Sequence, residues 1–384
     1  MEREEYWLWL GSLEGIGNRK RHRLLEWFHT PERIYMAQEK ELLPVPGLTE
    51  RDRAVLLRSG RNGETARILE EMEKKEISLL TLEDGRYPAG LKEICDCPVC
   101  FYYKGNLPED DKPSLAVVGA RNCTNYGRTI AEEFAEELAS CQVQIISGLA
   151  RGIDAAAHRG ALNGNGYTCG VLGCGADICY PAQNQDLYQE METRGGIISE
   201  FPPGTPPLAC HFPMRNRIIS GLCDGILIVE ARRKSGSLIT ADMALEQGRD
   251  VFAIPGRITD LLSEGCNNLI KMGAEPVGSP VDILNSLTME KYGFEKDCRL
   301  GEESTGQMFL STKGVEKKIM KNELILDSKE EMVYACLDLL PKSVQDVVDE
   351  TGMEVYDVMQ SLLSLELKNY IRQTAGSKYV KERG

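Results

Sequence analysis

The 384-residue sequence has no apolar run that approaches the roughly 20 residues of a membrane-spanning helix. Its amino terminus opens on acidic residues, and the apolar stretch Tyr6–Leu10 that follows is too short for a secretory signal peptide. The 13 cysteines are odd in number and scattered along a chain too long for a small disulfide-stapled secreted domain. We therefore expect a cytoplasmic protein that makes no membrane contact.

Several catalytic and nucleotide-binding signatures are missing as well. The chain has no Gly-x-x-x-x-Gly-Lys-Ser/Thr, no Gly-x-Ser-x-Gly, and only four histidines. The dinucleotide fingerprint Gly-x-Gly-x-x-Gly is not met after Gly119, and the glycines of Gly170–Gly175 stand in the wrong order. Asp154 and His158 could pair on one helix face, but no nucleophile accompanies them, and Asp154 more simply stabilises the start of its helix. We predict that the chain is not an enzyme and uses no cofactor.

Three cysteines within six residues, Cys95, Cys97 and Cys100, are the arrangement that comes nearest to a metal site. A fourth ligand at zinc-finger or zinc-ribbon spacing is missing, and His158 and His211 lie far off in the sequence. We predict no bound metal. The other cysteines stand mostly in or beside apolar strands, where a thiol is a small buried side chain.

The overall charge and the local charge of the chain disagree. With 45 basic and 59 acidic residues the net charge is −14, which argues against nonspecific coating of nucleic acid over the whole surface. Between His211 and Lys234, however, five basic residues (Arg215, Arg217, Arg232, Arg233 and Lys234) stand against Asp224 and Glu230. A local basic strip is therefore expected.

Apolar runs alternate with amphipathic stretches over residues 79–288, which we take as one domain. The expected strands are Leu115–Ala120, Gln144–Leu149, Tyr167–Leu172, Gly196–Phe201, Gly225–Ala231 and Asp250–Pro255. The expected helices are Tyr126–Ser140, Ile153–Leu162, Gln185–Glu192, Met214–Gly221 and Leu238–Gln247. Strands this apolar, separated by helices, indicate an α/β fold with a mostly parallel, Rossmann-like sheet covered on both faces.

Three of these strands end in small-residue loops that contain arginine or lysine. Strand ends of one polarity share one edge of a parallel sheet, so the loops should meet in a single crevice, each with the free N–H groups of a helix amino terminus. A row of such loops suits the phosphates of single-stranded nucleic acid. The candidate ligands are Gly119, Arg121, Gly148, Arg151, Gly152, Arg215, Arg217, Lys234, Ser235, Gly236, Ser237 and Thr240. Tyr180 and Phe212 either stack on bases or are buried beside the sheet.

The two ends of the chain read as helical modules. Residues 1–75 hold short helices, and the turns Gly15–Gly17 and Val45–Leu48 fit either a helix-hairpin-helix (SAM-like) domain that touches a DNA phosphate or a plain helical bundle. Residues 289–327 lose hydrophobic periodicity and are expected to be a linker. Residues 328–384 have the order of a winged helix.

The winged helix is expected to contain three helices and two strands that flank the turn Ala375–Ser377. The helices are Lys329–Leu340, Ser343–Thr351 and Glu354–Glu366, and the strands are Tyr370–Gln373 and Lys378–Val380. The third helix, which would enter a major groove, carries Glu354, Asp357 and Glu366 and no base before Lys368. We therefore expect this module to contact protein rather than to read DNA, which argues against a transcription regulator.

Five motifs follow one another through the middle of the chain. They are Val118–Asn122, Ile146–His158, Phe212–Gly221, Val229–Ala241 and Asn267–Ala274. In this order they resemble the motifs of the bacterial DNA-processing protein DprA (Smf) family, and the helical amino-terminal region and the winged-helix tail are similar to that family's too. Five collinear motifs are far more specific than a lone glycine loop.

The resemblance implies a single-stranded DNA-binding protein that protects incoming strands and loads the recombinase RecA during natural transformation. It also implies a homodimer formed through the Rossmann-like domain. By position, Arg121 and Lys234–Ser237 match the family's DNA-contacting motifs, and Arg215 and Arg217 match its basic pocket wall. Asn122 and Asn216 of the same motifs join the candidates.

Two points qualify the resemblance. The sequence has Cys95–Phe101 where the family has a proline-rich extended stretch, which favours a substituted structural strand over a zinc site. The alternative function is a phosphoribohydrolase that acts on nucleoside monophosphates, because that family shares a Rossmann-like scaffold. Its glycine-rich loop would match Ser235–Thr240, but Glu246 lies too far on to be its glutamate.

Overall fold

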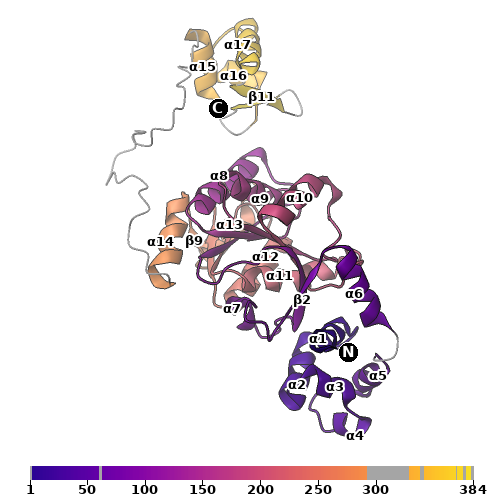
Figure 1. Cartoon of the computed structure of the whole chain (residues 1–384). Helices are drawn as coiled ribbons and strands as arrows, with labels where there is room; N and C mark the ends of the chain where they lie inside the picture. The colour runs from indigo at the N-terminus through magenta and orange to yellow at the C-terminus, as the bar shows by residue number, and fades with distance from the viewer. Residues whose placement is uncertain are drawn as a thin grey trace. The chain divides into compact units, whose positions relative to one another are not determined.

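The computed structural model describes residues 2–59, 63–291, 328–337, 341–368, 370–374 and 378–381. The chain divides into two compact units, Met1–Glu295 and Lys296–Gly384 (Figure 1). Most of the predicted linker, residues 292–327, and the predicted turn at residues 375–377 lie outside the described residues. Among the described residues, no helix combines the length and apolarity that crossing a bilayer requires.

Short helices fill the amino-terminal region, as the glycine turns predicted. They are α1 (Arg3–Ser12), α2 (Asn18–Phe28), α3 (Pro31–Met36), α4 (Glu39–Leu42), α5 (Glu50–Ser59) and α6 (Glu64–Lys74). The apolar run of α1 is not a surface feature, because Leu8 and Leu10 are fully buried. Gly15 and Gly47 turn the chain ahead of α2 and α5 with φ of 81° and 75°, a conformation that favours glycine. Whether these turns touch DNA stays a prediction.

The larger unit is built on a nine-stranded sheet with the order β1-β2-β6-β5-β4-β3-β7-β8-β9. Its strands are β1 (Ser78–Thr81), β2 (Cys100–Gly105), β3 (Ser114–Val118), β4 (Gln144–Ser147), β5 (Thr168–Leu172), β6 (Gly196–Ser199), β7 (Gly225–Ile228), β8 (Asp250–Ala253) and β9 (Glu275–Pro276). Strands β3 to β9 pair in parallel, and β1 and β2 add an antiparallel edge. The predicted Rossmann-like, mostly parallel sheet is confirmed.

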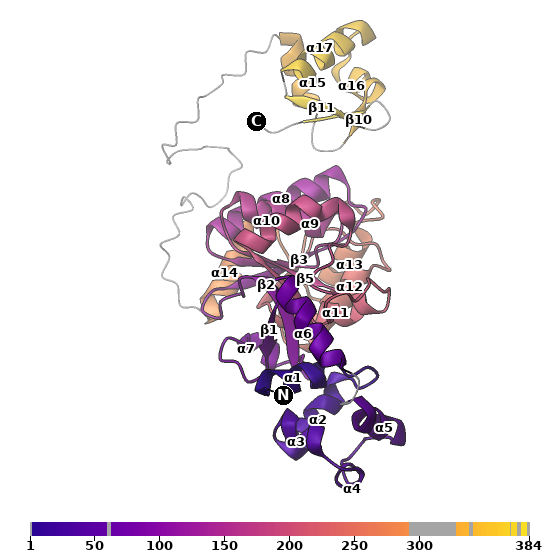
Figure 2. The same cartoon turned by 45° about the vertical axis from the view of Figure 1, so that its right-hand side comes forward.

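Helices cover both faces of this sheet (Figures 1 and 2). They are α7 (Ala89–Lys92), α8 (Asn125–Ser140), α9 (Ile153–Asn163), α10 (Gln185–Arg194), α11 (His211–Gly221), α12 (Gly236–Glu246), α13 (Glu264–Lys271) and α14 (Pro280–Lys291), with a 3-10 turn at Ala182–Asn184. Alternate strand residues serve the two faces: Ala116 and Val118 of β3 pack with α11, α12 and α13, whereas Leu115 and Val117 pack with α8 and α9. This alternation explains why the strands are apolar throughout.

The order in which the chain visits the strands reverses once, at β3, and this position is the topological switch point of the sheet. The chain runs from β3 outward through β4, β5 and β6, and it then returns to place β7 on the opposite side of β3. The loops that follow β3 and β7 therefore leave the sheet edge in different directions. A crevice forms where the strand order reverses, and that crevice is where α/β sheets bind their ligands.

The smaller unit has the predicted winged-helix order. Its elements are α15 (Ser328–Cys336), β10 (Lys342–Ser343), α16 (Val344–Thr351), α17 (Val355–Leu367), β11 (Ile371–Thr374) and β12 (Lys378–Lys381). Strand β12 lies between β10 and β11. The core between helices and sheet is formed by Val333, Val347, Val358 and Leu362. Helix α15 ends at Cys336, four residues before its predicted end at position 340.

Candidate nucleic-acid interface

The loops after β3 and β7 are locked together at the switch point. The carboxylate of Glu230, which follows β7 and is 5% exposed, accepts hydrogen bonds from Thr124 N at 2.8 Å and Thr124 Oγ1 at 2.5 Å. A Cβ on Gly119 would lie 2.9 Å from the carbonyl oxygen of Glu230. Glycine is therefore required at position 119 because protein, rather than a ligand, approaches it there.

A second glycine joins the loops after β3 and β4. Gly152 has a φ of 79°, and a Cβ there would lie 2.3 Å from the carbonyl oxygen of Ala120 and 2.7 Å from that of Arg121. Gly119 and Gly152 were expected from the sequence to be among the residues that contact a ligand. In the structure both close approaches are to neighbouring loops, so the glycines build the crevice.

Arg121 lines a cavity of about 450 Å³ at this edge of the sheet. Its guanidinium carbon lies 5.4 Å from the centre of the Phe212 ring, and the Phe212 and Tyr180 rings lie 5.6 Å apart with an interplanar angle of 32°. Tyr180 is 43% exposed, so the alternative of a buried aromatic is wrong for this residue. A cation beside two open rings is the arrangement that unpaired bases and their phosphates recognise.

The other cations of the crevice edge are also solvent-facing. Arg151 lines the same cavity, and Arg121, Asn122, Arg151 and Lys234 are all exposed. Within the described ranges of the chain, neither arginine nor Lys234 forms an ion pair. Three cations without acidic partners on an acidic protein leave their charge available to a polyanion.

Arg215 lies beneath this surface and organises it. The side chain is 4% exposed; Nη1 donates to the carbonyl oxygen of Gly148 at 2.8 Å and to that of Val171, and Nε donates to Asn216 Oδ1. Burial lowers the pKa of Arg215 to about 10, a shift that the nearby Asp154 carboxylate opposes. Arg215 therefore ties together the ends of β4 and β5 with little of its surface open to a ligand.

Arg217 does not join the crevice. It donates to both carboxylate oxygens of Glu200, at 2.8 and 2.6 Å, and its Nε lies 3.2 Å from Asp96 Oδ2. Residues two positions apart on an α-helix are separated by about 200° of rotation, so the side chains of Arg215 and Arg217 leave α11 on opposite sides. The structure brings together Arg121, Gly148, Arg151 and Arg215 around the cavity, and it separates Arg217 from them.

The third loop begins α12 beside the crevice but does not line the cavity. Ser235 caps the helix, because its Oγ accepts from Ser237 N at 3.4 Å, and its hydroxyl lies 2.8 Å from that of Ser237. Ser237 and Thr240 are buried, with exposed fractions of 8% and 2%. Among the candidate residues of this loop, Lys234 and Gly236 are the exposed ones, so they remain open to a phosphate.

Asp154 and His158, which share a helix face, form two separate sets of hydrogen bonds rather than a pair. Asp154 accepts from the backbone amides of Gly148 and Ala150, at 3.2 and 3.4 Å, and burial raises its pKa against the effect of Arg215. His158 is fully buried with Nδ1 2.7 Å from Thr168 Oγ1, and burial lowers its pKa to about 3. Both residues hold β4 and β5 to α9 rather than facing the cavity.

The three clustered cysteines separate in the structure. Cys95 is exposed, the Sγ of Cys97 lies 3.2 Å from His22 Nε2, and the Sγ of Cys100 donates to the carbonyl oxygen of Trp7 at 3.6 Å. In the part of the chain that the structure describes, no three metal-ligating side chains gather. Burial raises the pKa of the Cys97 and Cys100 thiols, as expected for packed side chains.

Two contributors to the crevice were not found from the sequence. The neighbours of Tyr180 in the loop after β5, Cys179 and Pro181–Gln183, line the cavity, and Glu230 braces the loop after β3. Neither position carries a local signal, because only the pairing of β3 with β7 and of β4 with β5 brings these loops together. Glu246, the candidate glutamate of a phosphoribohydrolase, ends α12 at the far end from Ser235.

Two family models match the chain. The first, described as DNA recombination-mediator protein A, covers residues 78–288, and the second, the DprA winged helix domain, covers residues 321–377. The protein Smf of Escherichia coli is 36% identical over 380 residues, which covers 99% of this chain and 96% of that protein. The chain belongs to the DprA (Smf) family.

Further DprA relatives agree with this assignment. The DNA processing protein DprA of Streptococcus pneumoniae is 49% identical over 201 residues, covering 52% of this chain and 71% of that protein. Its X-ray structure superposes with a TM-score of 0.67 at 39% identity, covering 75% of this chain and 99% of that one. A structure of DNA processing protein A from Helicobacter pylori, titled for its single-stranded DNA binding mode, superposes with a TM-score of 0.50 at 31% identity, covering 55% and 95%.

Proposed function

We propose that this DprA-family chain binds single-stranded DNA along the carboxyl edge of its sheet, as a non-catalytic recombination mediator. The observation that carries the proposal is that Arg121 and Arg151, exposed and without an ion pair among the described residues, line one cavity with the Tyr180–Phe212 pair, while Lys234 is exposed on a further loop that follows the sheet. The cations bind the phosphates and the aromatic rings stack on unpaired bases, so this combination binds single-stranded DNA of any base sequence. The single-stranded DNA-binding relative from H. pylori supports the same ligand.

The proposal assigns different roles to the candidate residues. Arg121, Arg151 and Lys234 contact phosphates, and Asn122 and Gly236 offer exposed polar groups beside them. The buried and half-buried members shape the crevice instead of touching the strand; they are Gly119, Gly148, Gly152, Arg215, Asn216, Ser235, Ser237 and Thr240. We infer three domains. Residues 79–288 bind the DNA strand, and residues 1–75 and 328–384 precede and follow this domain in the sequence.

Binding of a labelled oligonucleotide across a salt series tests the proposal. The wild-type chain should bind single strands more tightly than the matching duplex, because a duplex cannot offer unstacked bases to Tyr180 and Phe212. The affinity for single strands should fall steeply with salt, with little preference among sequences. Equal affinity for the duplex, or an affinity that salt leaves unchanged, would contradict a single-strand site of this kind.

We further propose that the bound strand is protected and then passed to a RecA recombinase, as in natural transformation. The family's description as a recombination mediator supports this step. The winged helix supports a protein contact rather than DNA reading, because α17 exposes Tyr356 (76%), Leu363 (60%) and Leu367 (77%). Large apolar side chains gathered on one helix face are typical of protein interaction sites.

A homodimer through the sheet domain is also proposed, and the loop after β8 supports it. Ile258 and Leu261 are 92% and 63% exposed on this loop, next to the residues that follow β7. Replacing both with glutamate should convert a dimer into a monomer in sedimentation-velocity runs, since like charges would face each other across the two-fold axis. Met36→Glu, at an apolar position 62% exposed on α3, is the matched control and should sediment as wild type.

A further inference from the structure

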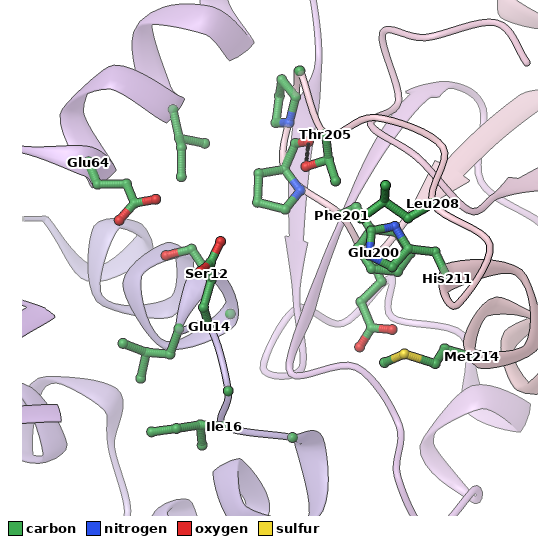
Figure 3. Close-up of a pocket in the computed structure, with 18 of the residues that line it drawn as sticks. Ser12, Glu14, Ile16, Glu64, Glu200, Phe201, Thr205, Leu208, His211 and Met214 are labelled. Atoms are coloured by element: carbon green, nitrogen blue, oxygen red, sulfur yellow. Dashed lines mark hydrogen bonds between the residues drawn. The ribbon is translucent and has the colours of Figure 1, made fainter. Parts of the chain in front are cut away.

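Helix α11 stands between two sites. Its first turns carry Phe212 and Arg215 into the DNA crevice, while Arg217 leaves on the other side. On that other side, a cleft of about 820 Å³ separates the sheet domain from the amino-terminal helices. Figure 3 shows Glu200 and Met214 on one wall of this cleft and Ser12 and Glu14 on the other.

A chain of buried polar contacts crosses the cleft from the amino-terminal region to α11. Asn18, the first residue of α2, donates from Nδ2 to Glu200 Oε1 at 2.5 Å, and Glu200 in turn accepts two bonds from Arg217. Asn18 also accepts from Arg21 Nη1 at 3.1 Å. Asn18 and Arg217 are 9% and 7% exposed, and the Glu200 side chain is 9% exposed.

Because the side chains of Asn18, Glu200 and Arg217 are largely shielded from water, the contacts between them are strong. Ion pairs removed from water are screened little by salt, and Nη2 of Arg217 reaches both carboxylate oxygens of Glu200, which fixes the distance between the two side chains. The backbone carbonyl of Arg217 is held separately, because it accepts from Gln247 Nε2 at 3.2 Å at the end of α12. The middle of α11 is thus held by contacts that lie outside the DNA crevice.

The position of α11 decides the geometry of the crevice. Phe212 carries the ring under Arg121 and beside Tyr180, and Arg215 carries the bonds to Gly148 and Val171. A shift of α11 would change the distance between the stacking platform and the phosphate-binding cations. Side chains that hold α11 therefore influence DNA binding without touching DNA.

We infer that Asn18, Glu200 and Arg217 are positioning residues for the DNA crevice, and that the amino-terminal helical region sets the crevice through them. This inference rests on the proposed function, because it names what fixes that same site. It gives Arg217 a role different from that of a phosphate ligand. It also gives the amino-terminal region a role that needs no DNA contact of its own.

The salt series separates positioning from contact in the full-length protein. Glu200→Gln should weaken single-stranded DNA binding about fivefold to tenfold, the range of coupling between neighbouring groups, while the slope of log affinity against log salt stays at the wild-type value. Asn18→Ala removes the hydrogen bond to Glu200 together with the one from Arg21, and it should weaken binding about twofold to threefold with the same unchanged slope. Thermal melts establish that each variant is folded at the assay temperature.

A double-mutant cycle shows whether the effect passes through α11. If Glu200 acts by placing Phe212, then adding Glu200→Gln to Phe212→Ala should cost less than Glu200→Gln costs alone. Glu93→Gln breaks an ion pair that involves none of Asn18, Glu200 and Arg217, namely Glu93 with Arg249 at 3.0 Å, and should leave the affinity unchanged. Full additivity in the cycle would show only a general loss of structure.

Two results overturn the inference while leaving the proposed function intact. One is wild-type affinity in both Glu200→Gln and Asn18→Ala; the other is a salt slope for Arg217→Gln reduced by as much as that for Arg121→Ala, which would make Arg217 a phosphate ligand. Failure of the wild-type chain to prefer single strands would instead remove the proposed function itself. The two failures are therefore distinguishable in one set of measurements.

Discussion

Replacing Arg121 and Lys234 together with alanine is expected to weaken single-stranded DNA binding at least a hundredfold at moderate salt. Each side chain is an exposed cation without an acidic partner among the described residues, and a charge-assisted bond to a phosphate contributes about 1.5–3 kcal/mol. The loss should be the same for every sequence, because phosphates carry no sequence information. Anisotropy titrations of a labelled oligonucleotide measure it.

The salt slope provides the sharper readout of the same double variant. A single strand releases about 0.7 of a counterion for each neutralised phosphate, so the slope of log affinity against log salt should fall by about 1.4. The matched controls are Arg194→Ala and Lys112→Ala, since both cations lie where strands begin, at the opposite edge of the sheet. If the double variant kept the wild-type slope, Arg121 and Lys234 would not be the phosphate ligands.

Arg215→Met is expected to lower the free energy of unfolding of the larger unit by about 3–5 kcal/mol. The substitution keeps much of the side-chain length but leaves the buried Asp154 carboxylate without its nearby cation, and removal of one partner of a buried charge pair costs about this much. The carbonyl oxygens of Gly148 and Val171 also lose their donor. Urea unfolding followed by circular dichroism measures the change.

A second substitution tests the cause of that loss. Asp154→Asn in the Arg215→Met background removes the stranded charge and should recover part of the stability, whereas the two changes would simply add if the residues were independent. Arg194→Ala, at an arginine whose side chain is 42% exposed, should change stability by no more than about 0.5 kcal/mol. A fully stable Arg215→Met protein would refute the view that Arg215 organises the crevice.

The sheet strands and covering helices followed from local patterns. The runs at Leu115–Ala120 and Gly225–Ala231 are apolar because both faces of the sheet are covered, and that requirement is visible in any short window. Helix boundaries moved by a few residues: α11 begins at His211 rather than Met214, and α12 at Gly236 rather than Leu238. The edge strands β1 and β9 were not predicted, because they have only four and two residues, and β2 was indicated only as a structural strand near Cys95–Phe101.

The site was predicted in part. The motif Arg215-Asn-Arg217 looked like one basic wall, but helix geometry sends its two arginines to opposite sides, one into the crevice and one to Glu200. The glycines at positions 119 and 152 were taken as places for a ligand, and they prove to be contacts between loops. In both cases the residue type indicated that the position matters for the site, but the sequence did not show which group the residue contacts.

By itself, the sequence determined that this chain is an α/β protein whose strand ends carry glycines and cations, because hydrophobic periodicity and loop chemistry act over a few residues. Only the tertiary structure decided which cations face solvent, that Tyr180 and Phe212 form an open pair beside Arg121, and that Glu200 takes Arg217 away from them. Those outcomes depend on strand order and helix rotation, which join residues from distant parts of the chain. No local sequence pattern predicts such contacts, since they form only when the folded sheet brings these segments together.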